Sequence, residues 1–156
     1  MDRLSWQDTW LHIAATMRKR SKCVGRQVGA VIVDTSNRPV AMGYNGPPAG
    51  LSTGPSCDLF CERAITGERV ASYDNCVSIH AEANALLFTD RSNYGGGTIY
   101  ISDPPCWECT KLISNSGLKR VVYLAADAPW RNLEKSKQLL LDCGMEVWEC
   151  PRSTDS

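Results

Sequence analysis

The chain has 156 residues, of which 43% are hydrophobic and 22% are charged, a composition typical of one soluble globular domain with a buried core. Its 17 basic and 17 acidic residues give a formal net charge of zero, so the basic excess of most polynucleotide-binding proteins is missing. The first residues contain no basic segment followed by an apolar run, and no stretch has the length of a membrane span, so we expect a cytoplasmic protein without polynucleotide or membrane partners.

The first part of the chain predicts a helix followed by a β-hairpin. Residues 6–20 carry apolar groups near helical spacing, which is typical of an amphipathic helix. Residues 28–33 form a short apolar, β-branched run that indicates a buried strand. After a turn at 37–39, residues 40–44 are expected to form the partner strand of a hairpin.

The rest of the chain predicts a long irregular stretch and then alternating helices and strands. Residues 45–77 contain three cysteines, and a connection of this length is usually functional or held by something. Helices are predicted at 81–90, 107–116 and 133–143, strands at 98–102, 120–125 and 145–149, and a break at 93–97. This alternation indicates a single α/β domain over residues 1–150, followed by a polar tail, 151–156, that we expect to be frayed.

Two short motifs carry residues that bind metals. His80-Ala81-Glu82 precedes the sequence P-C-W-E-C at 105–109, and eight cysteines in a cytosolic protein indicate metal ligands or catalytic groups sooner than disulfides. Cys106 and Cys109 lie three residues apart at the start of a predicted helix, which directs both thiolates to one side and favours their charge. With the nitrogen of His80, they leave the fourth position of a tetrahedral zinc ion for water, as in catalytic sites. This order of motifs is the signature of zinc-dependent base deaminases.

Glu82 gives the two motifs a catalytic interpretation. It lies two residues after His80, where it is poorly placed to bind the metal but well placed to face the water. We expect Glu82 to take a proton from that water, whose pKa zinc lowers, to protonate N3 of a cytosine ring and to pass a proton to the departing ammonia. A single C-x-x-C could instead be a structural zinc knuckle or a redox pair, and a single H-x-E arises by chance, but a structural zinc site would not need Glu82.

With these motifs the chain resembles the deoxycytidylate (dCMP) deaminase family over residues 21–150. The resemblance is carried by S-K-C at 21–23, V-G-A-V-I at 28–32, G-Y-N-G-P-P-A-G at 43–50, I-H-A-E-A-N-A at 79–85, P-C-W-E-C-T-K-L-I at 105–113 and S-G-L-K-R-V-V-Y at 116–123. The segment at 43–50 is the narrowest match, because a loop of this kind marks deaminases of the free monophosphate. The resemblance implies a three-layer α/β/α cytidine deaminase fold with a mixed sheet of about five strands. It also implies hydrolysis of dCMP to dUMP for thymidylate synthesis, and a homo-oligomer, often a hexamer.

The resemblance also implies residues that bind the substrate. Asn45 is expected to contact the sugar or phosphate, although the residues alone favour a role in stabilising its own turn. Ser21, Lys22 and Arg26 are candidate phosphate contacts because a dianion needs donors, while Lys22 and Arg26 could each be solvated surface charges. The chain departs from the family at Asp103-Pro104, where relatives often have a small hydroxyl residue.

In many members of the family the loop at 43–46 helps to bind dCTP as an activator and dTTP as an inhibitor across a subunit interface. On this resemblance the candidate effector-binding residues are Gly43, Tyr44, Asn45 and Gly46.

Four other cysteines are candidates for a second, structural zinc site, as in some relatives. They are Cys23, Cys57, Cys61 and Cys76. A closed tetrahedron of thiolates would hold the long irregular stretch in place, whereas the alternative is four thiols with no shared metal.

Three rival functions remain at this point. A polynucleotide deaminase, such as one acting on tRNA, shares the zinc motif but needs a basic surface. A non-catalytic zinc module would not need Glu82. A deaminase of a 5-methyl or 5-hydroxymethyl form of dCMP has the same motifs, and the sequence does not separate it from an enzyme for the unmodified base.

Overall fold

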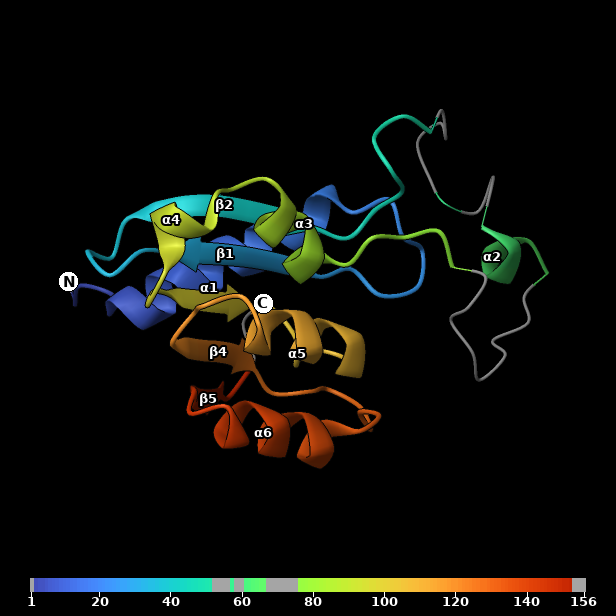
Figure 1. Cartoon of the computed structure of the whole chain (residues 1–156). Coiled ribbons are helices and arrows are strands. Elements are labelled where there is room, and N and C mark those ends of the chain that lie inside the picture. The colour runs from blue at the N-terminus through green and yellow to red at the C-terminus, as the bar shows by residue number, and fades with distance from the viewer. Residues whose placement is uncertain (1, 52–56, 58–60, 67–75, 153–156) are drawn as a thin grey trace.

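A five-stranded mixed sheet forms the centre of the fold (Figure 1), in a computed structural model that describes residues 2–51, 57, 61–66 and 76–152. The strands are β1 (Gly29–Val33), β2 (Pro39–Tyr44), β3 (Thr98–Ile101), β4 (Arg120–Leu124) and β5 (Glu146–Cys150). Their order is β2-β1-β3-β4-β5, with β1 antiparallel to β2 and β3, and with β3, β4 and β5 parallel. The predicted α/β class and mixed five-stranded sheet are confirmed.

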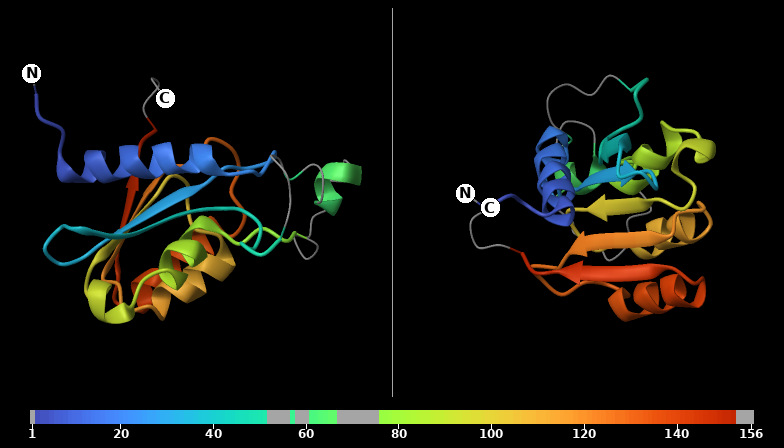
Figure 2. Two further views of the ribbon diagram at one scale, coloured as in Figure 1. Left: turned by 90° about the horizontal axis from the view of Figure 1, so that it is seen from above. Right: turned by 90° about the vertical axis from the view of Figure 1, so that its left-hand side faces the viewer.

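Helices cover both faces of this sheet, which gives the expected three layers (Figure 2). One face carries α1 (Trp6–Met17), which a 3-10 turn, η1 (Arg18–Arg20), extends. The other face carries α3 (Ala81–Leu87), α5 (Trp107–Ser114) and α6 (Leu133–Asp142). Two short helices, α2 (Glu62–Thr66) and α4 (Arg91–Tyr94), lie in the connections. Among the described residues, no helix combines the length and the apolar character needed to cross a membrane.

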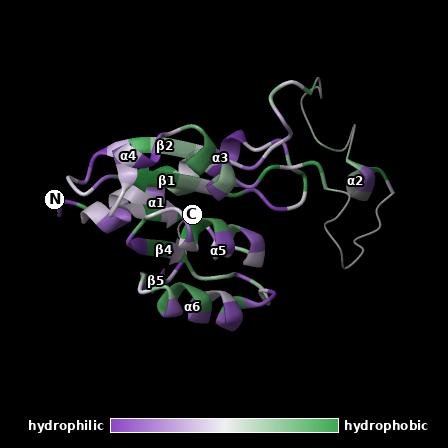
Figure 3. Ribbon diagram, in the orientation of Figure 1, coloured by the Kyte–Doolittle hydropathy of each residue, from purple (hydrophilic) through white to green (hydrophobic). Residues whose placement is uncertain are grey.

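Strand β1 is buried on both faces because helices cover it from both sides. Ala30 and Ile32 belong to the core beneath α3, α5 and α6, while Val31 and Val33 belong to the core beneath α1. This explains why residues 28–33 are apolar throughout instead of alternating. The helices of the second face show hydrophobic and hydrophilic sides in Figure 3, as expected for helices that pack on a sheet with one side only.

Two glycines let helices lie directly on the sheet. A Cβ atom at Gly29 would lie 2.0 Å from the carbonyl oxygen of Ala14 in α1, and one at Gly43 would lie 2.2 Å from that of Ala81 in α3. Only glycine allows such an approach of two backbones. Gly43 therefore fixes the start of α3 against β2.

The predicted elements exist, and most ends agree within two residues. The predicted helix at 81–90 instead ends at Leu87, and α4 occupies part of the predicted break at 93–97. Asp90 explains this new turn, since its carboxylate accepts hydrogen bonds from the backbone N–H and the hydroxyl of Ser92. Helix α2 lies within the predicted irregular stretch, 45–77, much of which falls outside the described residues.

The polar tail departs from its expected fraying at one residue. Arg152 donates hydrogen bonds to the carbonyl oxygens of Ala125 and Ser102 and to the carboxylate of Asp103. Residues 153–156, the rest of the tail, lie outside the described residues.

Candidate metal and catalytic site

His80, Cys106 and Cys109 come together where two helices begin. His80 is the N-cap residue of α3, and Cys106 is the N-cap residue of α5, with its Sγ accepting from the backbone N–H of Cys109 at 3.4 Å. Nδ1 of His80 lies 3.2 Å from Sγ of Cys106 and 3.4 Å from Sγ of Cys109. The three potential ligand atoms of this group all lie within 4.8 Å of one another, and no other such group is found among the described residues.

The geometry of these three atoms fits a zinc ion. With Zn–S bonds of about 2.3 Å and Zn–N bonds of about 2.0 Å, the donor atoms of a tetrahedral site lie about 3.5–3.8 Å apart. The observed separations of 3.2 and 3.4 Å are close to that edge length. One imidazole nitrogen and two thiolates are also ligands that zinc favours, and one tetrahedral position is left for a small ligand.

The three ligands are electrostatically coupled. A hydrogen bond from Cys109, together with one from His80, lowers the pKa of Cys106 to about 4. The hydrogen bond to Cys106 raises the pKa of His80. The same contact with Cys106, and then burial, raises the pKa of Cys109, because a second negative charge beside the first is unfavourable. A divalent cation is what would allow both sulfurs to be thiolates.

Glu82 lies in the first turn of α3, beside this group. Its side chain is buried, with the residue 3% exposed, and its carboxylate contacts the Cys109 side chain. Burial, and then the negative charge on Cys106, raise the pKa of Glu82 to about 7. A carboxyl group with a pKa near neutrality can both accept and return a proton, which is what a general acid–base residue must do.

Asn45 connects the segment after β2 to the segment before β1 by hydrogen bonds. Its Oδ1 accepts from the backbone N–H of Val28 at 2.8 Å, and its Nδ2 donates to the carbonyl oxygen of Arg26 at 2.7 Å. The buried amide thus holds the chain as it enters β1. This bridging of segments far apart in sequence is a different role from stabilisation of its own turn, and it leaves one N–H and one lone pair for a ligand.

The neighbours of Asn45 bind the segment that carries His80 and Glu82. Gly46 pairs with Ile79 through N–H···O bonds of 3.0 and 2.8 Å, and Nδ2 of Asn84 donates to the carbonyl oxygen of Tyr44 at 2.8 Å. Since Gly43 also packs against Ala81, residues 43–46 contact the segment that carries His80 and Glu82 on both sides of His80.

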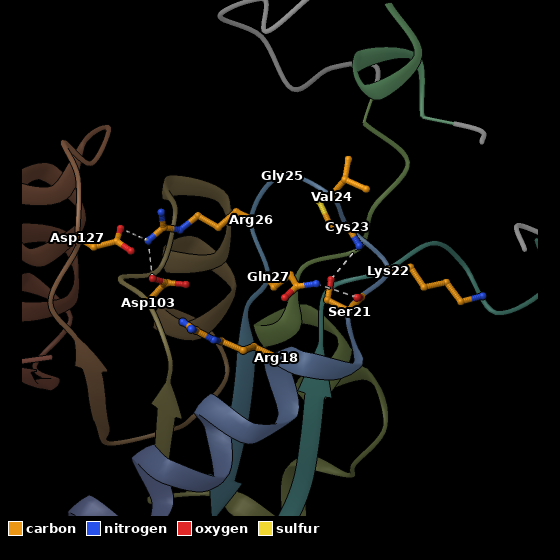
Figure 4. Close-up of a pocket in the computed structure, with 10 residues that line it drawn as sticks. All are labelled: Arg18, Ser21, Lys22, Cys23, Val24, Gly25, Arg26, Gln27, Asp103 and Asp127. Atoms are coloured by element: carbon orange, nitrogen blue, oxygen red, sulfur yellow. Dashed lines mark hydrogen bonds and ion pairs between the residues drawn. The ribbon is translucent and has the colours of Figure 1, made fainter. Parts of the chain in front are cut away.

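The predicted phosphate contacts line a cavity of about 540 Å³ (Figure 4), which is the size of a small-molecule pocket. Ser21, Lys22 and Arg26 lie on one wall, in the segment 21–27, and Arg18 adds a further cation. Asp103 also lines this cavity and stands three residues before Cys106, so the segment from Asp103 to Cys106 joins the cavity to the metal-binding group.

Sequence reasoning missed the contacts that hold Arg26. Nη2 of Arg26 contacts Oδ1 of Asp103 at 2.6 Å and Oδ1 of Asp127 at 3.0 Å, and its guanidinium carbon lies 4.5 Å from the ring centre of Trp130. The departure from the family at Asp103 was a signal for this cluster. Nothing in the sequence pattern singled out Asp127, or Arg152 in the polar tail.

The four remaining candidate ligands surround a second, smaller cavity. Cys23, Cys57, Cys61 and Cys76 all line a space of about 20 Å³. Sγ of Cys57 accepts from the backbone N–H of Val24 at 3.2 Å, and burial together with the neighbouring Cys23 raises the pKa of Cys57. In the described part of the chain, their sulfurs do not gather within 4.8 Å as the His80 group does.

Comparisons with known proteins agree with this geometry. A family model described as the cytidine and deoxycytidylate deaminase zinc-binding region matches residues 4–125, which include His80, Glu82, Cys106 and Cys109. The chain is 42% identical over 127 residues to the deoxycytidylate deaminase of Mycobacterium phage D29, covering 79% of this chain and 97% of that protein. It is 35% identical over 124 residues to the deoxycytidylate deaminase of Homo sapiens, covering 80% of this chain and 67% of that protein.

A solved structure is also similar over nearly the whole chain. The dCMP deaminase of the cyanophage S-TIM5, in complex with dCMP and dUMP, superposes with a TM-score of 0.73 at 26% sequence identity. The match covers 96% of this chain and 100% of that one.

Proposed function

The chain belongs to the family of cytidine and deoxycytidylate deaminases, and on this premise we propose that it hydrolyses dCMP to dUMP and ammonia. The observation that carries the proposal is the buried carboxylate of Glu82 beside the group formed by His80, Cys106 and Cys109. The relatives named as deoxycytidylate deaminases support the choice of substrate. In the cytoplasm, where we expect the enzyme to work, its product would supply thymidylate synthesis.

The residues of the site divide the chemistry between them. When His80, Cys106 and Cys109 bind zinc, the ion supplies an acidified water molecule as the nucleophile. Glu82 accepts a proton from this water as the oxygen adds to C4 of cytosine, and delivers it to N3. Glu82 then takes the remaining proton of the hydroxyl added at C4 and passes it to the amino group. The C4–N bond breaks, the C4=O bond of uracil forms, and ammonia leaves. The burial that raises the pKa of Glu82 favours its protonated form between the two transfers.

The cavity beside the site supports a free monophosphate as substrate. Arg18 and Arg26 line it together with the hydroxyl-bearing Ser21 and the carboxylates of Asp103 and Asp127, so a phosphate dianion would meet two cations. Lys22 also lines the cavity, but its side chain points away from these two arginines in Figure 4. Asn45 holds this wall in place from behind. A polynucleotide would need a longer basic surface, and the formal net charge of zero argues against it.

A panel of substrates tests the proposal. The purified protein is incubated with dCMP, 5-methyl-dCMP, 5-hydroxymethyl-dCMP, CMP, deoxycytidine and a deoxycytidine oligonucleotide, and the released ammonia is measured. We expect the highest kcat/KM with dCMP. A higher value with either 5-substituted nucleotide would favour a deaminase of modified dCMP. Release from the oligonucleotide but not from dCMP would overturn the proposal.

We further propose a homo-oligomer, with a hexamer as the expected form, that dCTP activates and dTTP inhibits through residues 43–46. The contacts of this segment with Ile79, Ala81 and Asn84 support the proposal, because a ligand on it would act directly on the segment that carries His80 and Glu82. Initial rates against dCMP concentration, with and without each effector, and the mass in solution by light scattering test it. A monomer, or hyperbolic curves that ignore both effectors, would contradict it.

A second, structural zinc bound by Cys23, Cys57, Cys61 and Cys76 is the remaining proposal. Their shared cavity of about 20 Å³ supports it, although their sulfurs would have to draw together around the ion. We expect two zinc ions per chain by elemental analysis, and one after Cys61→Ser. The matched control is Cys143→Ser, at an exposed cysteine, which should leave both ions in place. One zinc per unaltered chain would contradict the second site.

A further inference from the structure

Two arginines share one buried carboxylate oxygen at the wall of the cavity. The oxygen is Oδ1 of Asp103, whose side chain is 2% exposed, and it accepts from Nη2 of Arg26 at 2.6 Å and from Nη2 of Arg152. Figure 4 shows Arg26 reaching across to this carboxylate and to Asp127. A buried carboxylate needs a compensating cation, but a single arginine supplies enough charge. The second arginine therefore calls for a separate reason.

Arg152 is the more firmly held of the two. Its side chain is 19% exposed, and besides Asp103 it donates to the carbonyl oxygen of Ser102 at 2.9 Å and to that of Ala125 at 3.0 Å. Ser102 directly follows β3 and Ala125 directly follows β4, so Arg152 joins the ends of two parallel strands. These three hydrogen bonds hold the guanidinium of Arg152 in place against Asp103.

Arg26 is held more loosely and has donors to spare. Its side chain is 37% exposed, and its second carboxylate partner, Asp127, is 55% exposed and therefore well solvated. Its Nε is buried without a hydrogen-bond partner, while its guanidinium stacks on Trp130. Separation from a solvated carboxylate is inexpensive, and a phosphate can accept two parallel hydrogen bonds from a guanidinium.

We propose that Arg26 leaves Asp103 to bind the phosphate of the substrate, and that Arg152 is the positioning residue that permits this by keeping the Asp103 carboxylate compensated. The inference rests on the proposed deamination of dCMP and states how that site recognises a monophosphate. Without Arg152, the buried carboxylate would retain Arg26, and the phosphate would have to compete with it. Arg152 therefore controls phosphate affinity without touching the substrate.

Steady-state kinetics of three variants test this mechanism. Arg152→Gln should raise the KM for dCMP about tenfold, the effect of one charge-assisted hydrogen bond, with little change in kcat. Asp103→Asn removes the charge that retains Arg26, so by itself it should leave the KM unchanged or lower it. The double variant Arg152→Gln/Asp103→Asn should recover a KM within about threefold of the unaltered enzyme, since the two changes act through the same contact.

A purely structural role for Arg152 predicts a different pattern. If Arg152 only joined the strand ends, Asp103→Asn would remove a further contact. The double variant would then have a higher KM for dCMP than Arg152→Gln. That outcome, or a KM raised by Asp103→Asn alone, overturns the inference. Arg152→Lys keeps the cation and is expected to stay close to the unaltered KM, which serves as a second test if the glutamine variant does not fold. Arg120→Gln, which removes an exposed ion pair with Glu146, is the matched control and should leave the KM unchanged.

The experiment separates this inference from the proposed function. If the unaltered enzyme releases no ammonia from dCMP, both fail together. If it does, and the KM for dCMP is the same in Arg152→Gln, the deaminase assignment stands and the role of Arg152 fails. The affinities for the product dUMP and for deoxyuridine, which lacks the phosphate, measured by calorimetry, give a readout apart from turnover. Arg152→Gln should weaken the binding of dUMP and leave the binding of deoxyuridine unchanged.

Discussion

The metal-binding group with Glu82, and the cavity lined by Arg26 and Asp103, are built in opposite ways. His80, Glu82, Cys106 and Cys109 come from the first turns of two helices or from the residues that cap them. Around Asp103, by contrast, the cavity wall joins Arg26 from before β1 to Arg152 from the end of the described chain, across separations of 77 and 49 residues. In the first region local helix geometry places each pair, and the contact between the two pairs spans 26 residues; in the second region every contact joins distant segments.

This difference predicts different responses to substitution. Changes in the metal-binding group should remove the chemistry while the rest of the protein remains folded. Changes in the cavity should alter the affinity for the nucleotide by moderate factors, because several contacts each contribute to binding. Each of the following experiments tests whether that division holds.

The largest effect is expected from Glu82→Gln. The side chain keeps its size and loses the ability to accept a proton, so kcat should fall by about 10³-fold or more, while zinc content and fold are unchanged. Ammonia release and elemental analysis are the measurements. Glu134→Gln, at an exposed position of α6, removes a carboxylate as a matched control and should remain active. An active Glu82→Gln enzyme would assign the proton transfers to another group.

The next effect is expected from Gly43→Ala, which tests whether the metal-binding group depends on the packing of α3. The new Cβ would lie 2.2 Å from the carbonyl oxygen of Ala81, so α3 must move away from β2. We expect the free energy of unfolding to fall by about 1–3 kcal/mol, as for other overpacked sites, with a loss of zinc. Gly50→Ala, where a Cβ meets open space, is the control. Unchanged stability and zinc content in Gly43→Ala would show that α3 is not held by this contact.

Asn45→Ala tests the link between the two regions. The substitution leaves the backbone N–H of Val28 and the carbonyl oxygen of Arg26 without their side-chain partner, at a cost of about 1–3 kcal/mol of unfolding free energy. Because these bonds hold the wall that carries Arg26, the KM for dCMP should rise while zinc content is unchanged. Asn84→Ala, which removes the bond to Tyr44, is a matched amide on the other side of the segment. A lost zinc ion in Asn45→Ala would mean that the two regions are not separable.

The sequence was sufficient to place the two residues of each pair, His80 with Glu82 and Cys106 with Cys109, because the geometry within a pair is local. Cys106 and Cys109 are three residues apart at a helix start, and His80 and Glu82 are two apart at another, so the spacing alone brings each pair to one end of its helix. The central strand was also predictable, since an apolar run without alternation indicates burial on both faces.

The cavity wall was not predictable because its contacts join distant segments. The pair formed by Arg26 and Asp127 spans 101 residues, and no spacing rule connects them. Arg152 stands in a short polar tail, where composition favours fraying, but the acceptors that hold it exist only once the sheet has formed. Helix α4 was missed for a smaller reason, since the capping by Asp90 outweighed the glycines that follow.

The smallest effect is expected from Asp127→Asn, which loosens Arg26 from its exposed partner. Because Asp127 is well solvated, the free energy of unfolding should change by no more than about 0.5 kcal/mol. Loss of one competitor for the guanidinium should lower the KM for dCMP, by at most about threefold. Glu146→Gln, which breaks the similar exposed pair with Arg120 outside the cavity, should leave the KM unchanged. A KM raised about tenfold by Asp127→Asn would mean that Asp127 holds Arg26 in its binding position, and that the cavity wall is as rigid as the metal-binding group.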